Sequence, residues 1–227
     1  MIMYIMRHGS ADYEHDSLNE LGRAQAEALG KRLYRSGIDC AYVSPMGRVR
    51  ETAAPACRRL GITPQVEPWL SEQLNHEALT FKGGSWYFDA AVEDTRGNDR
   101  TPFDMQWYKN PVYRDITDGE RRWLEVMSNA DRLCVEHGYV REGLLYRSTG
   151  VHTEKVAVFC HYCMGLTLTA YLLGMSPAFY GSCFGLYTTG VTILDFGEHE
   201  AGERTSPICL CHSDLSHLYE AELPLYY

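Results

Sequence analysis

The 227-residue sequence predicts an α/β fold, a three-layer sandwich in which a mostly parallel central sheet carries helices on both faces. Short apolar runs alternate with helical patterns in the first third of the chain, and the alternation returns after residue 154. The run at 155–160 (KVAVFC) is apolar at nearly every position, which is typical of a central strand buried on both faces. A single domain over residues 1–227 is therefore expected, with an inserted aromatic-rich cap segment at about 80–138.

The expected strands are short apolar runs bounded by turn-forming residues. They lie at 2–6, 39–43, 62–66, 155–160, 188–196 and 208–212. Each expected helix combines an apolar stripe with capping or helix-stopping residues at its ends. The helices lie at about 20–36, 45–60, 118–136 and 164–173. Asn19 is the expected N-cap of the first helix and Gly37 its stop. Ser44 is the expected N-cap of the second, with Pro45 at the first helical position.

Composition and charge exclude several classes of protein. The formal net charge is −9, so neither nucleic acid nor an anionic membrane is an expected partner. No apolar run is long enough to cross a bilayer, and the N-terminal residues lack the pattern of a signal peptide. A cytoplasmic location is expected, in which the eight scattered cysteines stay reduced. Any anionic ligand must be held by a local group of arginines.

The middle of the chain, from about residue 80, differs from the rest. Glycine, proline, aspartate and aromatic residues dominate between residues 81 and 123. Long irregular segments of this kind often form lids or binding loops. A small core that covers one edge of the sheet is the alternative, and the two are compatible.

Cationic side chains follow three of the expected strands. Arg7 and His8 end the first strand, Arg48 comes shortly after the second, and His161 follows the central one. In open α/β sheets, ligands bind outside the carboxyl ends of the strands, so these side chains are expected to share one pocket. Arginine gives planar, bidentate contacts to phosphate oxygens, and a neutral imidazole can attack phosphorus. The pattern favours a site for a small phosphorylated substrate.

With its motifs in this order, the chain resembles the histidine phosphatase superfamily, also called the phosphoglycerate mutase-like family. The resemblance covers the whole chain apart from the middle segment. It is carried by Arg7-His8-Gly9, the run 18–26 (LNELGRAQA), Ser44-Pro45-Met46-Gly47-Arg48, Glu51-Thr52-Ala53 and the apolar strand before His161.

The resemblance implies a phosphoric monoester hydrolase in which His8 is the nucleophile and becomes phosphohistidine. Arg7, Arg48 and His161 would hold the phosphoryl group, with His161 also stabilising the transition state. A general acid must protonate the leaving oxygen, and Glu72, in Leu70-Ser71-Glu72, fits the context of the family. Glu77 and Asp12 are weaker alternatives for the acid. No metal and no cofactor are needed by this mechanism.

Two positions depart from the family's common pattern. Ser10 stands where many relatives carry an acidic residue, and Tyr162 stands after His161 where many carry glycine. Both are candidates for the rim of the substrate site, and neither change removes a catalytic group. The physiological substrate is therefore not given by the resemblance.

Three other interpretations remain open. Phosphoglycerate mutase-type phosphoryl transfer would use the same histidine, and a non-catalytic protein could bind a phosphorylated ligand in the same pocket. Cys160-His161-Tyr162-Cys163 and Cys209-Leu210-Cys211-His212 could be read as a zinc site. The oligomeric state, the motion of the cap segment and the role of His217 are not indicated by the sequence.

Overall fold

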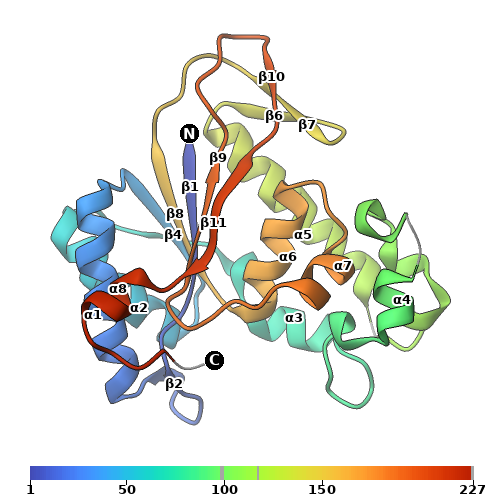
Figure 1. Ribbon diagram of the computed structural model, residues 1–227, viewed down its shortest axis with the longest axis horizontal. Coiled ribbons are helices and arrows are strands. Elements are labelled where there is room, and N and C mark those ends of the chain that lie inside the picture. Colours follow the sequence, from blue (N-terminus) through green and yellow to red (C-terminus); the bar gives the residue numbers. More distant parts are fainter. Residues whose placement is uncertain (98–99, 117, 226–227) are drawn as a thin grey trace.

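A six-stranded sheet forms the centre of the computed structural model, among the residues that the structure describes, 1–97, 100–116 and 118–225 (Figure 1). The strand order is β11-β9-β1-β8-β4-β5. Strands β1, β8, β4 and β5 run parallel, β9 pairs antiparallel with β1, and β11 pairs antiparallel with β9. The strands are β1 (Ile2–Arg7), β4 (Cys40–Val43), β5 (Gln65–Val66), β8 (Lys155–Cys160), β9 (Val191–Asp195) and β11 (Ile208–Asp214).

Helices cover both faces of this sheet, as the sequence predicts. Helices α1, α2 and α8 lie on one side, and α3, α5, α6 and α7 lie on the other (Figure 1). Their bounds are α1 (Glu20–Ser36), α2 (Gly47–Leu60), α3 (Glu72–Ala78), α5 (Gly119–Glu136), α6 (Tyr162–Leu172), α7 (Pro177–Cys183) and α8 (Ser216–Glu220). Because side chains alternate along a strand, β8 sends Val156 and Val158 into one core and Ala157 and Phe159 into the other. None of the helices within the described ranges has the length and apolar character needed to span a bilayer.

The first helix begins and ends where its sequence predicts. Asn19 Oδ1 accepts a hydrogen bond from the Gly22 amide at 2.9 Å. Gly37 adopts a φ of 67°, in the left-handed region, and its N–H reaches the carbonyl oxygens of Leu33 and Tyr34. These local caps fix the length of α1, because each satisfies backbone groups that the helix itself leaves unpaired.

The prediction that Ser44 caps the second helix is wrong. Helix α2 begins at Gly47, with Met46 at the N-cap position and no side-chain cap from that residue. The Gly47 amide instead donates to Asp16 Oδ2 at 2.7 Å, from the turn before α1. With the cap supplied from elsewhere in the chain, the Ser44 hydroxyl is free to face the histidine after β8.

The remaining elements are short. The hairpin of β2 (Ala11–Asp12) and β3 (Ser17–Leu18) carries Asp16 in its turn. A small second sheet contains β6 (Tyr139–Glu142), β7 (Leu145–Ser148) and β10 (Arg204–Thr205). The 3₁₀ helices are η1 (Pro68–Leu70), η2 (Tyr87–Asp89), η3 (Thr101–Phe103), η4 (Trp107–Lys109) and η5 (Pro111–Tyr113), and α4 spans Val92–Arg96.

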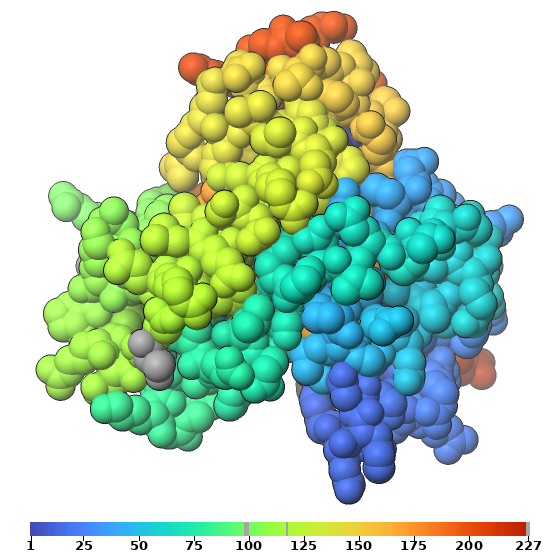
Figure 2. Space-filling model, turned by 180° about the vertical axis from the view of Figure 1, so that it is seen from behind, coloured from blue at the N-terminus to red at the C-terminus, as the bar shows by residue number. Residues whose placement is uncertain are grey.

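The segment 80–138 packs beside α6 and α7 around an aromatic core of its own. Tyr87, Trp107, Tyr113 and Trp123 are all buried there, and the rings of Tyr87 and Trp107 stack 4.6 Å apart. In Figure 2 the molecule is notched at its lower edge, between the blue N-terminal residues and the teal and green residues that follow α2. The segment therefore lies on one side of this notch, next to the ends of the parallel strands.

Candidate active site

The carboxyl ends of β1 and β8 bring the predicted cationic side chains together. Arg7 is paired with Cys160 across the two strands, and the His8 amide donates to the Cys160 carbonyl at 3.1 Å. The imidazole rings of His8 and His161 therefore lie 5.2 Å apart, centroid to centroid. Arg48, from the first turn of α2, reaches both rings: Nε lies 3.3 Å from His8 Nε2 and Nη2 lies 3.3 Å from His161 Nδ1.

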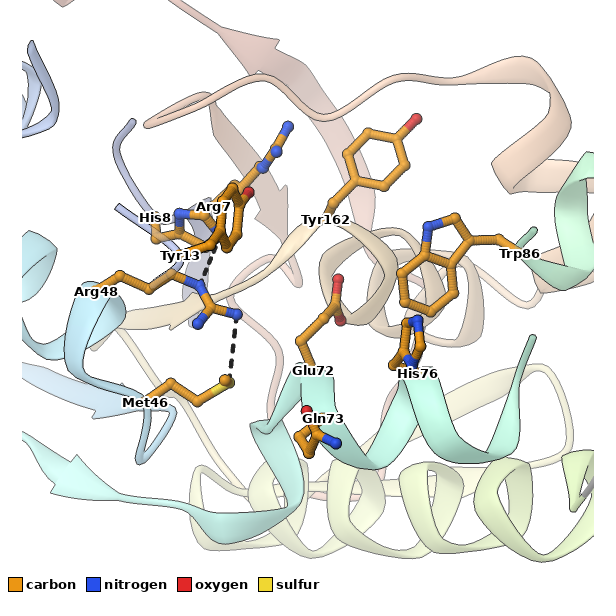
Figure 3. Close-up of a pocket in the computed structure, with 10 residues that line it drawn as sticks. All are labelled: Arg7, His8, Tyr13, Met46, Arg48, Glu72, Gln73, His76, Trp86 and Tyr162. Carbon is orange, nitrogen blue, oxygen red and sulfur yellow. Dashed lines mark hydrogen bonds between the residues drawn. The ribbon is translucent and has the colours of Figure 1, made fainter. Parts of the chain in front are cut away.

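A pocket of about 320 Å³ opens over this group (Figure 3). Five of its lining residues are site residues that the sequence predicts: Arg7, His8, Arg48, Glu72 and Tyr162. The other five are Tyr13, Met46, Gln73, His76 and Trp86, which sequence reasoning did not identify. His161 is fully buried and lies behind Arg48 rather than on the pocket wall.

His8 is held as a neutral imidazole, with the lone pair of Nε2 directed towards Arg48 Nε. Its Nδ1–H donates to the Gly9 carbonyl at 2.7 Å, which leaves the lone pair on Nε2. Burial lowers the pKa of His8 to about 3, and the nearby charges of Arg7 and Arg48 act in the same direction. The ring is therefore unprotonated at neutral pH, as a nucleophile must be.

His161 is also neutral, and its tautomer follows from its two partners. Arg48 Nη2 can only donate, so His161 Nδ1 accepts and Nε2–H donates to Ser44 Oγ at 2.8 Å. Burial lowers the pKa of His161 well below its ordinary value, and the positive charges of Arg48 and Arg7 add to the effect. Ser44 was missed as a site residue, and its position directly after β4 was the one sequence signal that could have identified it.

Each arginine is oriented by a fixed partner and covered by a tyrosine. Arg7 Nη1 donates to the Leu186 carbonyl at 2.8 Å, while its buried Nε has no hydrogen-bond partner within the part of the chain that the structure describes. Tyr162 lies over the Arg7 guanidinium, 5.0 Å from ring centroid to Cζ. Tyr13 covers Arg48 in the same way at 5.3 Å. These contacts fix the orientation of both guanidinium groups. The Nε–H of Arg7 remains an N–H donor of the kind whose hydrogen bonds phosphate oxygens accept.

Asp16 forms an ion pair with Arg48 at the edge of the pocket. Its Oδ1 lies 2.5 Å from Arg48 Nη1, and its Oδ2 accepts from the Gly47 amide. One carboxylate therefore fixes both the start of α2 and the direction of the arginine that the helix carries. Sequence reasoning did not find this residue, because 32 positions separate it from its partner.

Glu72 is the carboxyl group that enters the pocket. It begins α3, and its two oxygens accept the amides of Cys163 at 2.8 Å and Met164 at 3.0 Å, in the first turn of α6. Asn75 Nδ2 adds a third donor at 3.2 Å. Burial raises the pKa of Glu72 above its ordinary value, although the two amides, Asn75 and Arg7 oppose the effect. A raised pKa is what a general acid at neutral pH requires.

The other predicted candidates lie elsewhere. Glu77 accepts a hydrogen bond from Gln73 Nε2 at 2.8 Å on the surface of α3, and Asp12 pairs with His15. Neither lines the pocket. Ser10 is also not brought to it: the Ser10 hydroxyl accepts from Asn19 Nδ2 at 2.8 Å.

The cysteine motifs form no metal site within the described ranges, in which no group of three or more His, Cys, Asp or Glu side chains is arranged to hold an ion. Cys160 Sγ donates to the His161 carbonyl and Cys163 Sγ lies 3.8 Å from Thr167 Oγ1, both in the core. Cys209 and Cys211 lie on β11, at the edge of the sheet. The zinc interpretation therefore has no ligand set among these residues.

Comparisons with solved structures give the same fold. The chain is 17% identical to phosphoserine phosphatase from Entamoeba histolytica, solved with 3-phosphoglyceric acid, over 96% of this chain and 98% of that one, with a TM-score of 0.61. It is 19% identical to a mycobacterial glucosyl-3-phosphoglycerate phosphatase, solved with VO3, over 86% and 90% of the chains, with a TM-score of 0.53. A putative alpha-ribazole-5'-P phosphatase from Escherichia coli is 17% identical over 89% and 97%, with a TM-score of 0.56.

No match was found among curated protein sequences. The model of one protein family, described as the histidine phosphatase superfamily (branch 1), matches residues 3–205, nearly the whole chain. The family match includes both histidines, both arginines and Glu72. On this match and on its fold, the chain belongs to the histidine phosphatase superfamily.

Proposed function

We propose that this protein hydrolyses phosphate monoesters of small molecules through a covalent phosphohistidine on His8. The observation that carries the proposal is the orientation of His8: Nδ1–H is bound to the Gly9 carbonyl, so the lone pair is on Nε2, where it faces the pocket and Arg48 Nε. Glu72 lines the same pocket, with its pKa raised by burial. Its family and its structural neighbours are phosphatases, which supports this enzyme class.

In the proposed first step, His8 Nε2 attacks phosphorus and the bond from phosphorus to the ester oxygen breaks. Glu72 gives its proton to that oxygen, so the alcohol leaves neutral. In the second step, a water molecule gives a proton to the Glu72 carboxylate and attacks phosphorus, and the bond to Nε2 breaks. Inorganic phosphate leaves, with His8 again neutral and Glu72 again protonated, and the cycle needs no metal or cofactor.

Arg7, Arg48 and His161 are proposed to stabilise the phosphoryl oxygens. The buried Nε of Arg7 has no partner among the described residues, and the Arg48 guanidinium lies between the two histidines. Burial is the main cause of the lowered His161 pKa, and a bound dianion offsets the arginine charges that add to it. We also propose that the chain forms one domain and that segment 80–138 is its cap, because this segment supplies Trp86 to the pocket wall.

A cytoplasmic location belongs to the same proposal. All eight cysteines are free thiols, and seven of them have raised pKa values caused first by burial: Cys40, Cys57, Cys134, Cys160, Cys163, Cys209 and Cys211. A thiol with a raised pKa is a weak nucleophile at neutral pH and behaves as a small apolar side chain. Such thiols suit a reducing compartment.

Rapid-quench trapping tests the covalent step. The wild-type protein is mixed with a ³²P-labelled aryl phosphate in EDTA, and the denatured protein is assayed for acid-labile, base-stable label. His8→Ala is expected to lose both label and turnover, whereas His199→Ala, which removes a histidine from the loop before β10, is expected to keep both. Turnover that persists in His8→Ala contradicts the proposal. A stable phosphoenzyme that passes its group only to a phosphoglycerate indicates a mutase, and binding of phosphate without label or turnover indicates a binding protein.

A further inference from the structure

Glu72 divides the pocket into two halves. Figure 3 shows its carboxyl group in the middle, with His8, Arg7 and Arg48 on one side and Trp86 and His76 on the other. In the proposed reaction, the ester oxygen must touch Glu72 while phosphorus faces His8. The alcohol part of the substrate therefore extends from Glu72 towards Trp86 and His76.

The far half has an aromatic wall that is held in place from several sides. The Trp86 amide donates to Asp89 Oδ2 at 2.9 Å, and Trp86 pairs with Thr80 in an isolated β-bridge. The indole meets the His76 ring edge to face, with centroids 5.7 Å apart, and stacks on Phe88 at 6.1 Å. Because these contacts already restrict the Trp86 ring, little side-chain conformational entropy is lost when a ligand packs against it.

The same wall continues to the mouth of the phosphate half. Phe88 meets Tyr162 edge to face at 6.0 Å, and Tyr162 covers Arg7. A series of ring contacts thus runs from Trp86 through the buried Phe88 to Tyr162, which covers Arg7. At about 320 Å³, the pocket is at the small end of the range for ligand sites, which suits a phosphoryl group with one ring system.

Cationic side chains are restricted to the phosphate half. Arg7 and Arg48 are the only lysine or arginine residues that line the pocket, within the part of the chain described, and the proposed mechanism uses both. The far half offers the Glu72 carboxyl, the Gln73 amide and the rings of His76 and Trp86. A carboxylate on the alcohol part, such as that of 3-phosphoglycerate, finds no arginine or lysine there and lies close to Glu72.

We propose that the substrate is the phosphate monoester of an alcohol that carries an aromatic ring and no carboxylate, with the ring packed against Trp86 and His76. The proposal rests on the proposed function, because that function sets which end of the substrate faces Glu72. It differs from phosphoserine and glucosyl-3-phosphoglycerate, which are named for two of the structural neighbours.

The test compares benzyl phosphate, cyclohexylmethyl phosphate and 3-phosphoglycerate. The first two have similar size and both leave as primary alcohols, so they differ chiefly in aromaticity. Aromatic contacts predict a kcat/KM for benzyl phosphate about 3- to 10-fold above that for cyclohexylmethyl phosphate, and 3-phosphoglycerate is expected to be the poorest of the three. The preference should disappear in Trp86→Leu and persist in Phe103→Leu, an exposed aromatic residue of the same segment outside the pocket.

A gain-of-function variant keeps the test independent of folding defects in Trp86→Leu. Gln73 is exposed on α3 and lines the far half, so Gln73→Arg should raise kcat/KM for 3-phosphoglycerate relative to benzyl phosphate. Equal rates for benzyl and cyclohexylmethyl phosphate, or a preference for 3-phosphoglycerate in the wild type, overturn the substrate proposal and leave the phosphatase intact.

Failure of the proposed function has a different signature. Absence of turnover and label on every ester would contradict the phosphatase itself. Binding of benzylphosphonate and cyclohexylmethylphosphonate is therefore measured in parallel by calorimetry, since neither compound can be hydrolysed. Tighter binding of the benzyl compound supports the aromatic site even without turnover, and equal binding overturns it.

Discussion

Arg122 donates a hydrogen bond from Nε to Asn75 Oδ1 at 2.8 Å, and both side chains are fully buried. This bond fixes the Asn75 amide so that Nδ2 faces Glu72 Oε2, at 3.2 Å. Arg122 is itself held by the Trp69 carbonyl, at 2.6 Å, and by Glu125, at 3.0 Å. The guanidinium on α5 therefore acts as a positioning group for the proposed acid on α3, although it never touches the pocket.

Replacing Asn75 should move the alkaline limb of the pH profile. The Asn75 donor favours the ionised form of Glu72, so Asn75→Ala removes one influence that lowers the Glu72 pKa. The acid then keeps its proton to higher pH, and the alkaline fall in kcat/KM for an alkyl phosphate shifts upward. Asn129→Ala, an amide on α5 that bonds a helix carbonyl, serves as the matched control. An unchanged limb in Asn75→Ala would mean that the contact is structural.

The loss of activity on replacing Glu72 should depend on the leaving group of the ester. Glu72→Gln keeps the hydrogen bonds of the side chain in part but cannot protonate an alkoxide, so kcat/KM for an alkyl phosphate is expected to fall about 10²- to 10⁴-fold. A p-nitrophenyl ester, which leaves without protonation, should lose far less. Steady-state kinetics of both esters from pH 5 to 9 check this. Equal losses for the two esters would assign Glu72 a structural role, and Glu77→Gln, on the surface of the same helix, is the control.

The sign of the pH dependence follows from the two groups. Glu72 must carry its proton in the first step, so activity on alkyl esters is lost as pH rises through its raised pKa. His8 must be unprotonated, and with a pKa of about 3 it stays so throughout the range from pH 5 to 9. If the pH profile of kcat/KM for an aryl ester shows an acidic limb between pH 5 and 9, that limb therefore does not report the protonation of His8.

Ser44 is expected to matter for rate more than for stability. Ser44→Ala leaves the Nε2–H of His161 without its acceptor in a fully buried site. The ring can then rotate away from Arg48, and we expect kcat to fall about tenfold, which corresponds to about 1.4 kcal/mol of activation free energy. Thermal unfolding and kcat are measured side by side, with Ser216→Ala on α8 for comparison. A variant with full kcat would show that His161 needs no orientation from Ser44.

His217 on α8 supports the site from behind. Its Nδ1 accepts from Arg32 at 3.4 Å, so Nε2–H donates to Thr189 Oγ1 at 3.1 Å. Thr189 has a φ of 57°, and its amide donates to the Arg7 carbonyl at 3.0 Å and lies 3.3 Å from the His8 carbonyl. Through His217 and Thr189, helix α8 is thus linked to the backbone of His8, the proposed nucleophile.

Protonation of His217 should destabilise the fold at low pH. Burial lowers its pKa from 6.5 to about 4, so between these values the unfolded chain binds a proton that the folded one does not. The contribution of neutral His217 to the free energy of unfolding is therefore fully present above pH 6.5. It falls as pH decreases towards 4, by about 3 kcal/mol at most. Urea unfolding at pH 7 and 4.5 should show a smaller loss in His217→Gln than in the wild type. Identical losses in the two proteins would contradict this assignment.

Local signals predicted the parts of the fold that depend on neighbouring residues. Asn19 and Gly37 fix both ends of α1 through partners within four residues, so the sequence alone is sufficient. Ser44 failed as a cap because its hydroxyl has a partner 117 residues away, which no local pattern contains. The predicted strand at 62–66 is limited to Gln65–Val66, since only these residues pair with β4.

The half of the pocket that contains His8 and the two arginines was more predictable than the half that contains Trp86 and His76. Arg7, His8 and His161 follow apolar strands, and the carboxyl ends of parallel strands meet at one edge of a sheet. Trp86 and His76 follow no such rule. They reach the pocket because an irregular segment and a seven-residue helix pack together, and neither has a periodic pattern that fixes a direction.

The position of β1 has a consequence for the order in which the molecule folds. The strand lies between β8 and β9, so the His8 amide is bound to Cys160 and the Arg7 carbonyl to Thr189. The residues of β1 therefore depend on partners more than 150 positions later in the chain, and closing so long a loop is slow. A nascent chain that stops before residue 155 lacks both neighbours of its first strand. The proposed phosphatase activity should therefore appear only after β8 and β9 have paired with β1, and its onset can serve as a reporter of complete folding.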